Sequence, residues 1–327
     1  MGTNLGGARP RRKPILKAIL AATLAGAVCS PLWSAQSQTP NWQAAAGGKM
    51  AFDDASVRQN TNAASSDEVG SNFPLGPGDV YFPNGGHFRA TNFPFVAYIN
   101  FAYKITDNQA QFLLPQLPNW VFTTRFDIQG TAQGNPTKDQ MRLMMQSLLA
   151  DRFKLSVHYE TRQIPAFALV VDQSGSLGPL LQRHPDDSPC YTTPQSPAPT
   201  APPQMFDSRF PVTCGGILGM NPSGPGRVRA GARNVPMEQI ASSLTGGDSG
   251  LNRPVLDRTG LTGTFDFAIE FAPPPNNPFG PGPKSQPVPA APTFVEALKE
   301  QLGLRLEPLT GQFDVLVIDN VEEPPAN

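Results

Sequence analysis

The order of the expected secondary structure elements repeats once along the chain, and this repeat constrains the fold more than any other feature. Each half reads as strand, helix, strand, helix, strand, strand. Residues 89–94 (RATNFP) resemble the start and end of 229–236. Residues 126–128 (FDI) match 265–267 (FDF). We infer an internal duplication of a unit of about 80 residues, with a chance repeat of strand and helix order as the alternative.

The expected elements follow from apolar patterns of period 2 and 3.6 and from helix caps. In the first half, a turn at Ile164-Pro165 should separate the last two strands. Strands are expected at residues 50–58, 87–92, 125–130, 153–159 and 166–172, with helices beginning at Asn92-Pro94 and Thr137. In the second half, strands are expected at 227–234, 264–271, 304–307 and 314–319, with helices beginning at Pro236 and Thr293. The pattern predicts an α+β fold of two related strand-helix-strand-helix-strand-strand units, with a mixed or antiparallel sheet and helices packed on one face.

Composition divides the chain into segments, because proline and glycine concentrate between the patterned regions. We expect a secretory signal peptide (1–35), a linker (36–48), a first α+β unit (49–172), a Pro/Gly-rich insertion (173–226), a second α+β unit (227–322, with a loop at 273–292) and a tail (323–327). The insertion is treated as a separate segment because a structureless loop of that length is uncommon inside a compact domain.

The beginning of the chain has the pattern of an export signal. Residues 14–35 (PILKAILAATLAGAVCSPLWSA) follow a basic stretch that ends at Lys13. A basic start, an apolar run of about fifteen residues and a small-residue exit are typical of a secretory signal. The apolar run is shorter than the ~20 residues that a membrane span requires. We therefore expect an exported chain, in the periplasm or outside the cell, with no transmembrane span after signal removal.

The charge balance bears on the kind of partner. The chain has 25 Lys and Arg against 26 Asp and Glu. The first 35 residues hold five of the cations and none of the acids, so the remainder has an excess of six acidic residues. Nucleic-acid binding calls for a basic patch or stripe. The expected partner is therefore an unknown extracytoplasmic ligand or protein, and not a nucleic acid.

Two of the three cysteines lie outside the signal. An exported chain with two such cysteines, Cys190 and Cys214, favours a disulfide between them. This bond would close a loop of about 24 residues, worth roughly 3 kcal/mol in the chain-entropy description. Free or metal-binding thiols are the alternative, although two ligands without a nearby second pair do not make a zinc site.

Residue patterns that carry known chemistry are incomplete in this sequence. Residues 247–250 (GDSG) match the letters of a serine-protease nucleophile segment, but no histidine stands in the matching context, so Ser249 is interpreted as part of a turn. The glycine patterns for phosphates and dinucleotides are absent. His158 and Glu160 share one face of a strand, which is too little for a metal site. We assign no catalytic residue, no metal ligand and no cofactor.

The chain contains the segments FDDASVRQN (52–60), GGHFRATNFP (85–94), LPNWVFTTRFDIQG (117–130), MMQSLLADRFKLSVHYETRQIPAFALVV (144–171), RPVLDRTGLTGTFDFAIEF (253–271) and EALKEQLGLRLEPLTGQFDVLVIDNVEEP (296–324). Together these six segments resemble an exported protein family of unknown function that is greatly multiplied in acidobacterial-type soil bacteria. Some members look like extracytoplasmic parts of membrane metallopeptidase sensors of the beta-lactam-sensing type. The resemblance implies a sensing or binding role, and it transfers no catalytic residue.

These observations favour an exported, non-catalytic protein that acts in binding, sensing or interaction with an unknown ligand. One alternative is a secreted hydrolase with an unrecognised site, for which His158, Glu160 and Asp257 are the first suspects. The other alternative is a structural or surface-adhesive protein that polymerises through exposed strand edges.

Overall fold

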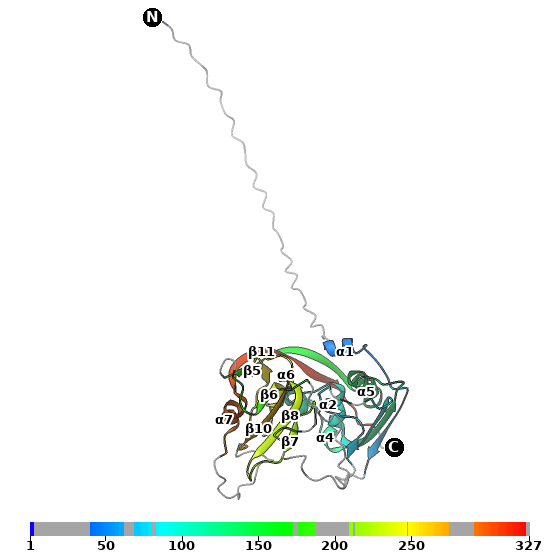
Figure 1. The fold of residues 1–327 in the computed structure, drawn as a ribbon. Helices are drawn as coiled ribbons and strands as arrows, with labels where there is room; N and C mark the ends of the chain where they lie inside the picture. The colour runs from blue at the N-terminus through cyan, green and yellow to red at the C-terminus, as the bar shows by residue number, and fades with distance from the viewer. Residues whose placement is uncertain are drawn as a thin grey trace. The chain divides into compact units, whose positions relative to one another are not determined.

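The fold is known from a computed structural model, which describes residues 1–2, 40–61, 69–79, 81, 83–172, 176–186, 209–211, 213–246, 248–274 and 291–324. Nearly all of the expected signal segment and Cys190 lie outside the described residues. The account below concerns the compact unit Ser37–Asn327, shown in Figure 1. Among the described residues, no helix is long and apolar enough to cross a membrane.

The helices and strands fall into two series. The first comprises α1 (Asn41–Ala45), β1 (Asp54–Asn60), β2 (Gly70–Ser71), β3 (His87–Pro94), α2 (Phe95–Ala102), α3 (Asp107–Leu113), the 3₁₀ turn η2 (Leu114–Gln116), α4 (Trp120–Thr123), β4 (Arg125–Thr131), α5 (Lys138–Phe153) and β5 (Ser156–Val171). The second comprises β6 (Leu181–Arg183), β7 (Leu218–Met220), β8 (Val228–Pro236), α6 (Met237–Ser243), β9 (Val255–Asp257), β10 (Thr264–Phe271), α7 (Phe294–Ala297), the π-helical turn η4 (Leu298–Leu302) and β11 (Leu304–Asn320). We call these series the first half and the second half.

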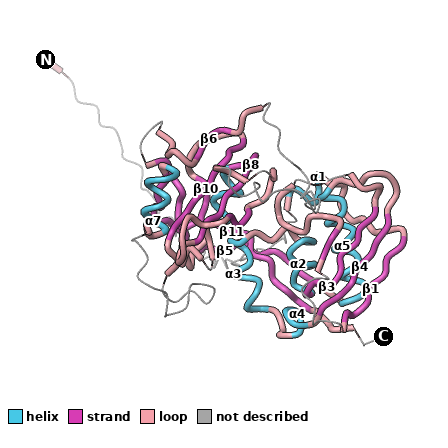
Figure 2. The backbone as a smooth tube through the Cα atoms, turned by 60° about the horizontal axis from the view of Figure 1, so that its bottom comes forward, coloured by secondary structure: helices cyan, strands magenta, loops and turns pink. Residues whose placement is uncertain are grey.

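Each half contains a four-stranded antiparallel sheet, and the strand order is the same in both. The order is β1-β4-β3-β2 in the first half and β6-β10-β8-β7 in the second. The interior strands are β4 and β3 in the first half and β10 and β8 in the second (Figure 2). The α+β class with mixed or antiparallel sheets is therefore confirmed, and the two four-stranded sheets have the same strand order.

The same local irregularity occurs in both sheets. Asn92 in β3 and Asn234 in β8 have φ angles of 61° and 55°, in the left-handed region that asparagine tolerates better than most residues. The backbone N–H of Asn92 donates to Asp127 Oδ1 at 2.8 Å, and that of Asn234 donates to Asp266 Oδ1 at 3.0 Å. These paired contacts fix which residues of the two halves correspond.

The helix caps agree in part with the sequence. Thr137 caps α5 and Thr293 caps α7, each in a capping box with the residue three positions on, as predicted. Asn92 is not a cap, because it lies inside β3 and the residue before α2 is Pro94. Its polar side chain and tolerance of positive φ serve the strand irregularity instead.

The last two strands expected in each half form one long strand. β5 and β11 pair antiparallel along their length, with Gln163 opposite Gln312 near the middle. The turn predicted at Ile164-Pro165 is wrong. Phe167 donates its N–H to Pro254 O at 2.8 Å, on the side away from β11. Donor directions alternate along a strand, so an N–H at position 165 would also face away from β11, and the proline removes no hydrogen bond from this pairing.

The two long strands connect two hydrophobic cores. Leu155 directly before β5 packs in the first core, whereas Leu169 near the end of β5 packs in the second. β11 runs the opposite way, so Leu304 lies in the second core and Leu316 in the first. Each half therefore completes its core with a strand end from the other half.

Candidate functional site

A groove of about 470 Å³ lies where the two halves meet. Loop 76–79, the start of α3 and Tyr159 line it from the first half. Helix α6, strand β9 and the part of β11 around Asp314 line it from the second half. We call it the interhalf groove. Concave sites with a few converging polar groups are the usual ligand sites of proteins, which makes this groove the candidate site.

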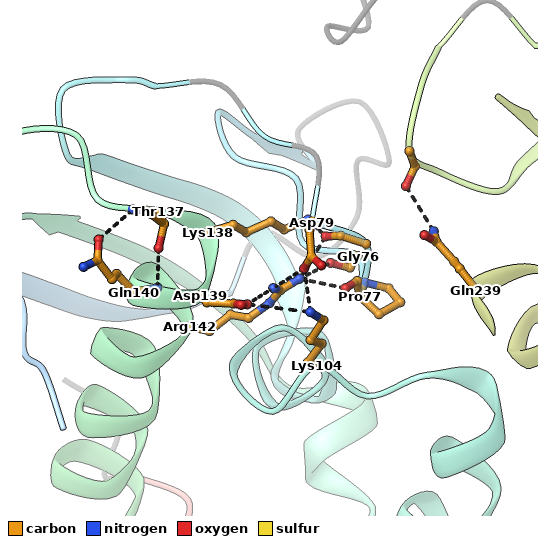
Figure 3. A network of polar contacts seen from close by, with 12 residues as sticks. Gly76, Pro77, Asp79, Lys104, Thr137, Lys138, Asp139, Gln140, Arg142 and Gln239 are labelled. Atoms are coloured by element: carbon orange, nitrogen blue, oxygen red, sulfur yellow. Dashed lines mark hydrogen bonds and ion pairs between the residues drawn. The ribbon is translucent and has the colours of Figure 1, made fainter. Parts of the chain in front are cut away.

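A buried arginine holds one wall of the groove in place. The side chain of Arg142 in α5 is fully buried, and it donates to Pro77 O at 2.8 Å and Gly78 O at 2.9 Å (Figure 3). It also forms ion pairs with Asp79, at 3.0 Å, and with Asp139. Because a buried cation is tolerated only when it is paired and hydrogen-bonded, these contacts fix the loop against α5.

Glycine at position 78 lets the same loop approach the second half. A Cβ atom there would lie 2.5 Å from Gly215 O and 3.0 Å from Gln239 Nε2. Gln239 in α6 itself donates to Gly215 O at 3.0 Å. Any larger residue at position 78 would displace this backbone, so the close contact between the halves depends on the missing side chain.

Asp79 and Lys104 form the charged pair at the floor of the groove. Lys104 Nζ lies 2.6 Å from Asp79 Oδ1, and Figure 3 shows Asp79 between Lys104 and Arg142. Desolvation works to raise the pKa of Asp79, but hydrogen bonds from the two cations lower it below the ordinary value. Asp79 is therefore a carboxylate at neutral pH, and its side chain is 69% exposed, so it remains open to a ligand.

Lys138 is a second buried cation behind the loop. Its Nζ donates to Gly78 O at 2.5 Å. Burial lowers the pKa of Lys138 to about 7, and the neighbouring charge of Arg142 acts in the same direction. The charge behind the groove therefore changes near neutral pH.

Aromatic side chains form the apolar part of the groove. Trp42, Tyr103 and Tyr159 line it, and Lys104 Nζ lies 6.0 Å from the centre of the Trp42 ring. Burial raises the pKa of Tyr103 to about 12 and raises that of Tyr159 as well. Both phenols therefore stay neutral and can offer a hydrogen bond beside an apolar ring face.

The remaining ionisable residues of the lining are acidic. Glu238, Asp257 and Asp314 belong to the second-half wall. Asp257 is engaged locally, because it accepts from Thr259 Oγ1 at 2.7 Å, and Asp314 accepts from Thr161 Oγ1 at 2.8 Å. With Asp79 already paired to cations, the groove presents more negative than positive charge to a ligand.

The three suspects of the hydrolase alternative do not come together. His158 lies 3.2 Å from Glu160 and 2.7 Å from Asp319, on the half-exposed face of β5 and β11. Asp257 pairs with Leu169 of β5. Leu169 is eleven positions after His158, which corresponds to roughly 35 Å of extended strand. Hydrogen bonds to Glu160 and Asp319 raise the pKa of His158. His158 and Glu160 thus form a surface cluster, and Asp257 belongs to the interhalf groove.

Other residues singled out from the sequence have local structural contacts. Ser249 Oγ donates to Gly246 O at 2.8 Å within a turn, as interpreted. Cys214 is buried, and because Cys190 lies outside the described residues, their disulfide stays a prediction. His184, which belongs to the expected Pro/Gly-rich insertion, has a side chain that is only 7% exposed, with Nδ1 2.7 Å from Asp266 Oδ1. In the described part of the chain, no group of three potential metal ligands comes together.

Apart from Asp257, the sequence did not point to the groove residues. Asp79, Lys104, Arg142 and Asp314 lie far apart in the sequence, and no short motif contains them. The one available signal was Arg142, a charged residue within the apolar stripe of an otherwise amphipathic helix. A charge at such a position indicates a buried partner.

The fold and groove define an α+β protein of two interlocked, similar halves with a polar cleft between them. The chain belongs to the family described as "Protein of unknown function (DUF3738)", whose match covers residues 96–321. No curated protein and no solved structure matches the chain. The expected resemblance to a family of unknown function is thereby confirmed.

Proposed function

We propose that this chain is an exported, non-catalytic binding or sensing protein that holds its ligand in the interhalf groove. The observation that carries the proposal is the composition of the groove: neutral tyrosines, a tryptophan and an acidic rim converge from both halves on one cleft. The signal-like segment at residues 14–35 supports action in the periplasm or outside the cell. The sensing role implied by the family resemblance is part of the same proposal.

The ligand that fits this chemistry is a polar molecule with a positively charged amine. Glu238 and Asp314 are exposed at the rim and attract such a group at long range. The ring faces of Trp42 and Tyr159 suit the apolar side of a peptide or sugar, and a cation placed over a ring gains further attraction. Amino sugars and peptides with free amino groups have this combination.

Two contacts argue for binding over polymerisation. β11 is an edge strand, and an open edge invites pairing with another chain. The side chain of Gln116 occupies part of this edge: its Nε2 donates to Leu316 O at 3.2 Å, and its Oε1 accepts from Ile318 N at 3.2 Å. At β11, this contact leaves less of the edge open to the strand pairing that the adhesive alternative requires.

The test uses ligand pairs that differ only in charge. The protein used is residues 36–327, without the signal-like segment, which we call the mature chain. It is titrated calorimetrically with chitosan trimer and with its N-acetylated form, and with a tripeptide before and after N-acetylation. We expect at least one amine-bearing form to bind more tightly than its acetylated counterpart, and binding to weaken as salt rises.

Matched variants locate the binding. Glu238→Gln with Asp314→Asn should weaken binding of the amine form at least tenfold, whereas Asp53→Asn, an exposed acid outside the groove, should leave it unchanged. Equal binding by the charged and acetylated forms, or equal binding by the double variant, would refute the proposal.

A further inference from the structure

A second cavity, of about 670 Å³, lies on the sheet of the second half, beside β8 and β10. Its walls are mainly apolar and include Ile217, Leu244, Leu251, Phe267, Ile269 and Phe271. We call it the β8–β10 cavity. Helix α3 of the first half lines it as well, through Asp107, Ala110 and Gln111. No residue lines both this cavity and the interhalf groove.

The first half fills the corresponding place with phenyl rings. Phe88 stands four residues before Asn92, and Phe101 stands nine residues after it. Their rings stack at a centroid distance of 5.7 Å, and the ring of Phe73 lies 6.1 Å from Phe88 and 5.9 Å from Phe101. All three are buried in the first core.

The second half has small residues at these positions. Counting from Asn234 in the same way gives Ala230 in place of Phe88 and Ser243 in place of Phe101. Both Ala230 and Ser243 line the β8–β10 cavity. On the neighbouring strand β7, Gly219 pairs with Ala230. A Cβ atom added to Gly219 would meet no atom within 4 Å. The two halves therefore share the strand order of their sheets, while the ring cluster is missing from the second half.

The covering helix is also shorter in the second half. Lys154 and Gly303, both in the left-handed conformation, end the two corresponding helices. The first-half helix before Lys154 has 16 residues, whereas α7 and η4 together run only from Phe294 to Leu302. About two helical turns that cover the first sheet have no described helical counterpart over the second.

From this comparison we propose that the β8–β10 cavity binds a small aromatic molecule that carries an amino group. Its ring takes the volume that the side chains of Phe88 and Phe101 fill in the other half. A concave site of this size with mainly apolar walls suits an aromatic guest. Asp107 and Asp248 stand at its rim, so an amine on the ring is attracted and a carboxylate is repelled. Burial raises the pKa of Asp107, and a bound cation would lower it again.

The experiment uses tryptamine and indole-3-acetate, which share one ring and differ in charge. We expect tryptamine to bind the mature chain with a Kd on the order of 0.1–1 mM, a typical range for a ligand of this size, and indole-3-acetate to bind at least tenfold more weakly. Methyl NMR should show shifts at Ala230, Leu244 and Ile269, and none at Ala90 or Ile128 of the first half.

Variants that restore the rings provide the decisive control. Ala230→Phe with Ser243→Phe should abolish tryptamine binding, and Ser56→Phe on the exposed side of β1 should leave it intact. If the double variant does not fold, the methyl shifts in the unmodified chain show whether tryptamine binds in the β8–β10 cavity. Absence of tryptamine binding, shifts outside the cavity, or undiminished binding by a folded double variant would overturn the proposal. Because these variants leave the interhalf groove unchanged, the result is independent of the proposed function.

Discussion

At the scale of single residues, Arg142 is the side chain on which the interhalf groove depends most. It is buried and joins two acids and three carbonyl oxygens of loop 76–78 to α5. Arg142→Met should lower the free energy of unfolding by about 3–5 kcal/mol, because Asp139 and the loop carbonyls lose their partner. Urea denaturation measures the loss.

The matched control for Arg142 is another arginine of the same helix. Arg152 is 55% exposed and forms an ion pair with its neighbour Asp151, so Arg152→Met should change the unfolding free energy by less than about 1 kcal/mol. Equal losses for the two variants would mean that the buried network does not stabilise the loop.

Because Lys138 is buried, we expect the stability of the fold to depend on pH. Burial lowers the pKa of Lys138 in the folded chain to about 7, whereas a lysine in the unfolded chain has a pKa of about 10.4. Between these two values the unfolded state binds more protons, so the lysine destabilises the fold less as pH rises. The stability of the original chain relative to Lys138→Met should therefore increase from pH 7 to pH 10. A pH-independent difference in denaturation midpoint would contradict this assignment.

At the scale of elements, β5 and β11 are the strands that each serve both cores. Leu316→Ala removes a side chain from the first core and Leu169→Ala removes one from the second. Each should cost about 2–5 kcal/mol. Of the described residues, Trp42 and Trp120 report by fluorescence, and both pack against or within the first half.

The informative comparison is therefore Leu169→Ala. If the strands couple the halves, this variant should shift the tryptophan transition about as far as Leu316→Ala does. The exposed Val295→Ala is the control and should have little effect. A tryptophan transition that does not respond to Leu169→Ala would show that the halves unfold separately.

The sequence predicted the helices and their caps better than it predicted how strands continue and which residues come together in the fold. Capping at Thr137 and Thr293 was visible because cap chemistry is local. The turn predicted at Ile164-Pro165 was wrong. A proline interrupts a strand only where its missing N–H would face the partner strand, and the sequence alone does not show which side that is. The groove was missed for a related reason: Asp79 and Asp314 meet only after both halves have folded.

At the scale of the whole molecule, we expect the two similar halves to unfold together, because each contributes a strand end to the core of the other. The repeat was detectable from the sequence because the strand and helix order is the same twice. The divergence between the copies was not detectable from pattern alone. The copies differ in side-chain volume at Ala230 and Ser243. The consequence follows only from the structure, in which the counterparts Phe88 and Phe101 stack on each other.

Native-state hydrogen exchange of the mature chain, read by mass spectrometry in low denaturant, tests this coupling most directly. Peptides covering β4 and β10, the central strands of the two sheets, should open with the same free energy and the same dependence on denaturant, since both open only in global unfolding. Exchange of β10 at a clearly lower free energy, while β4 stays protected, would contradict the account of two interlocked halves.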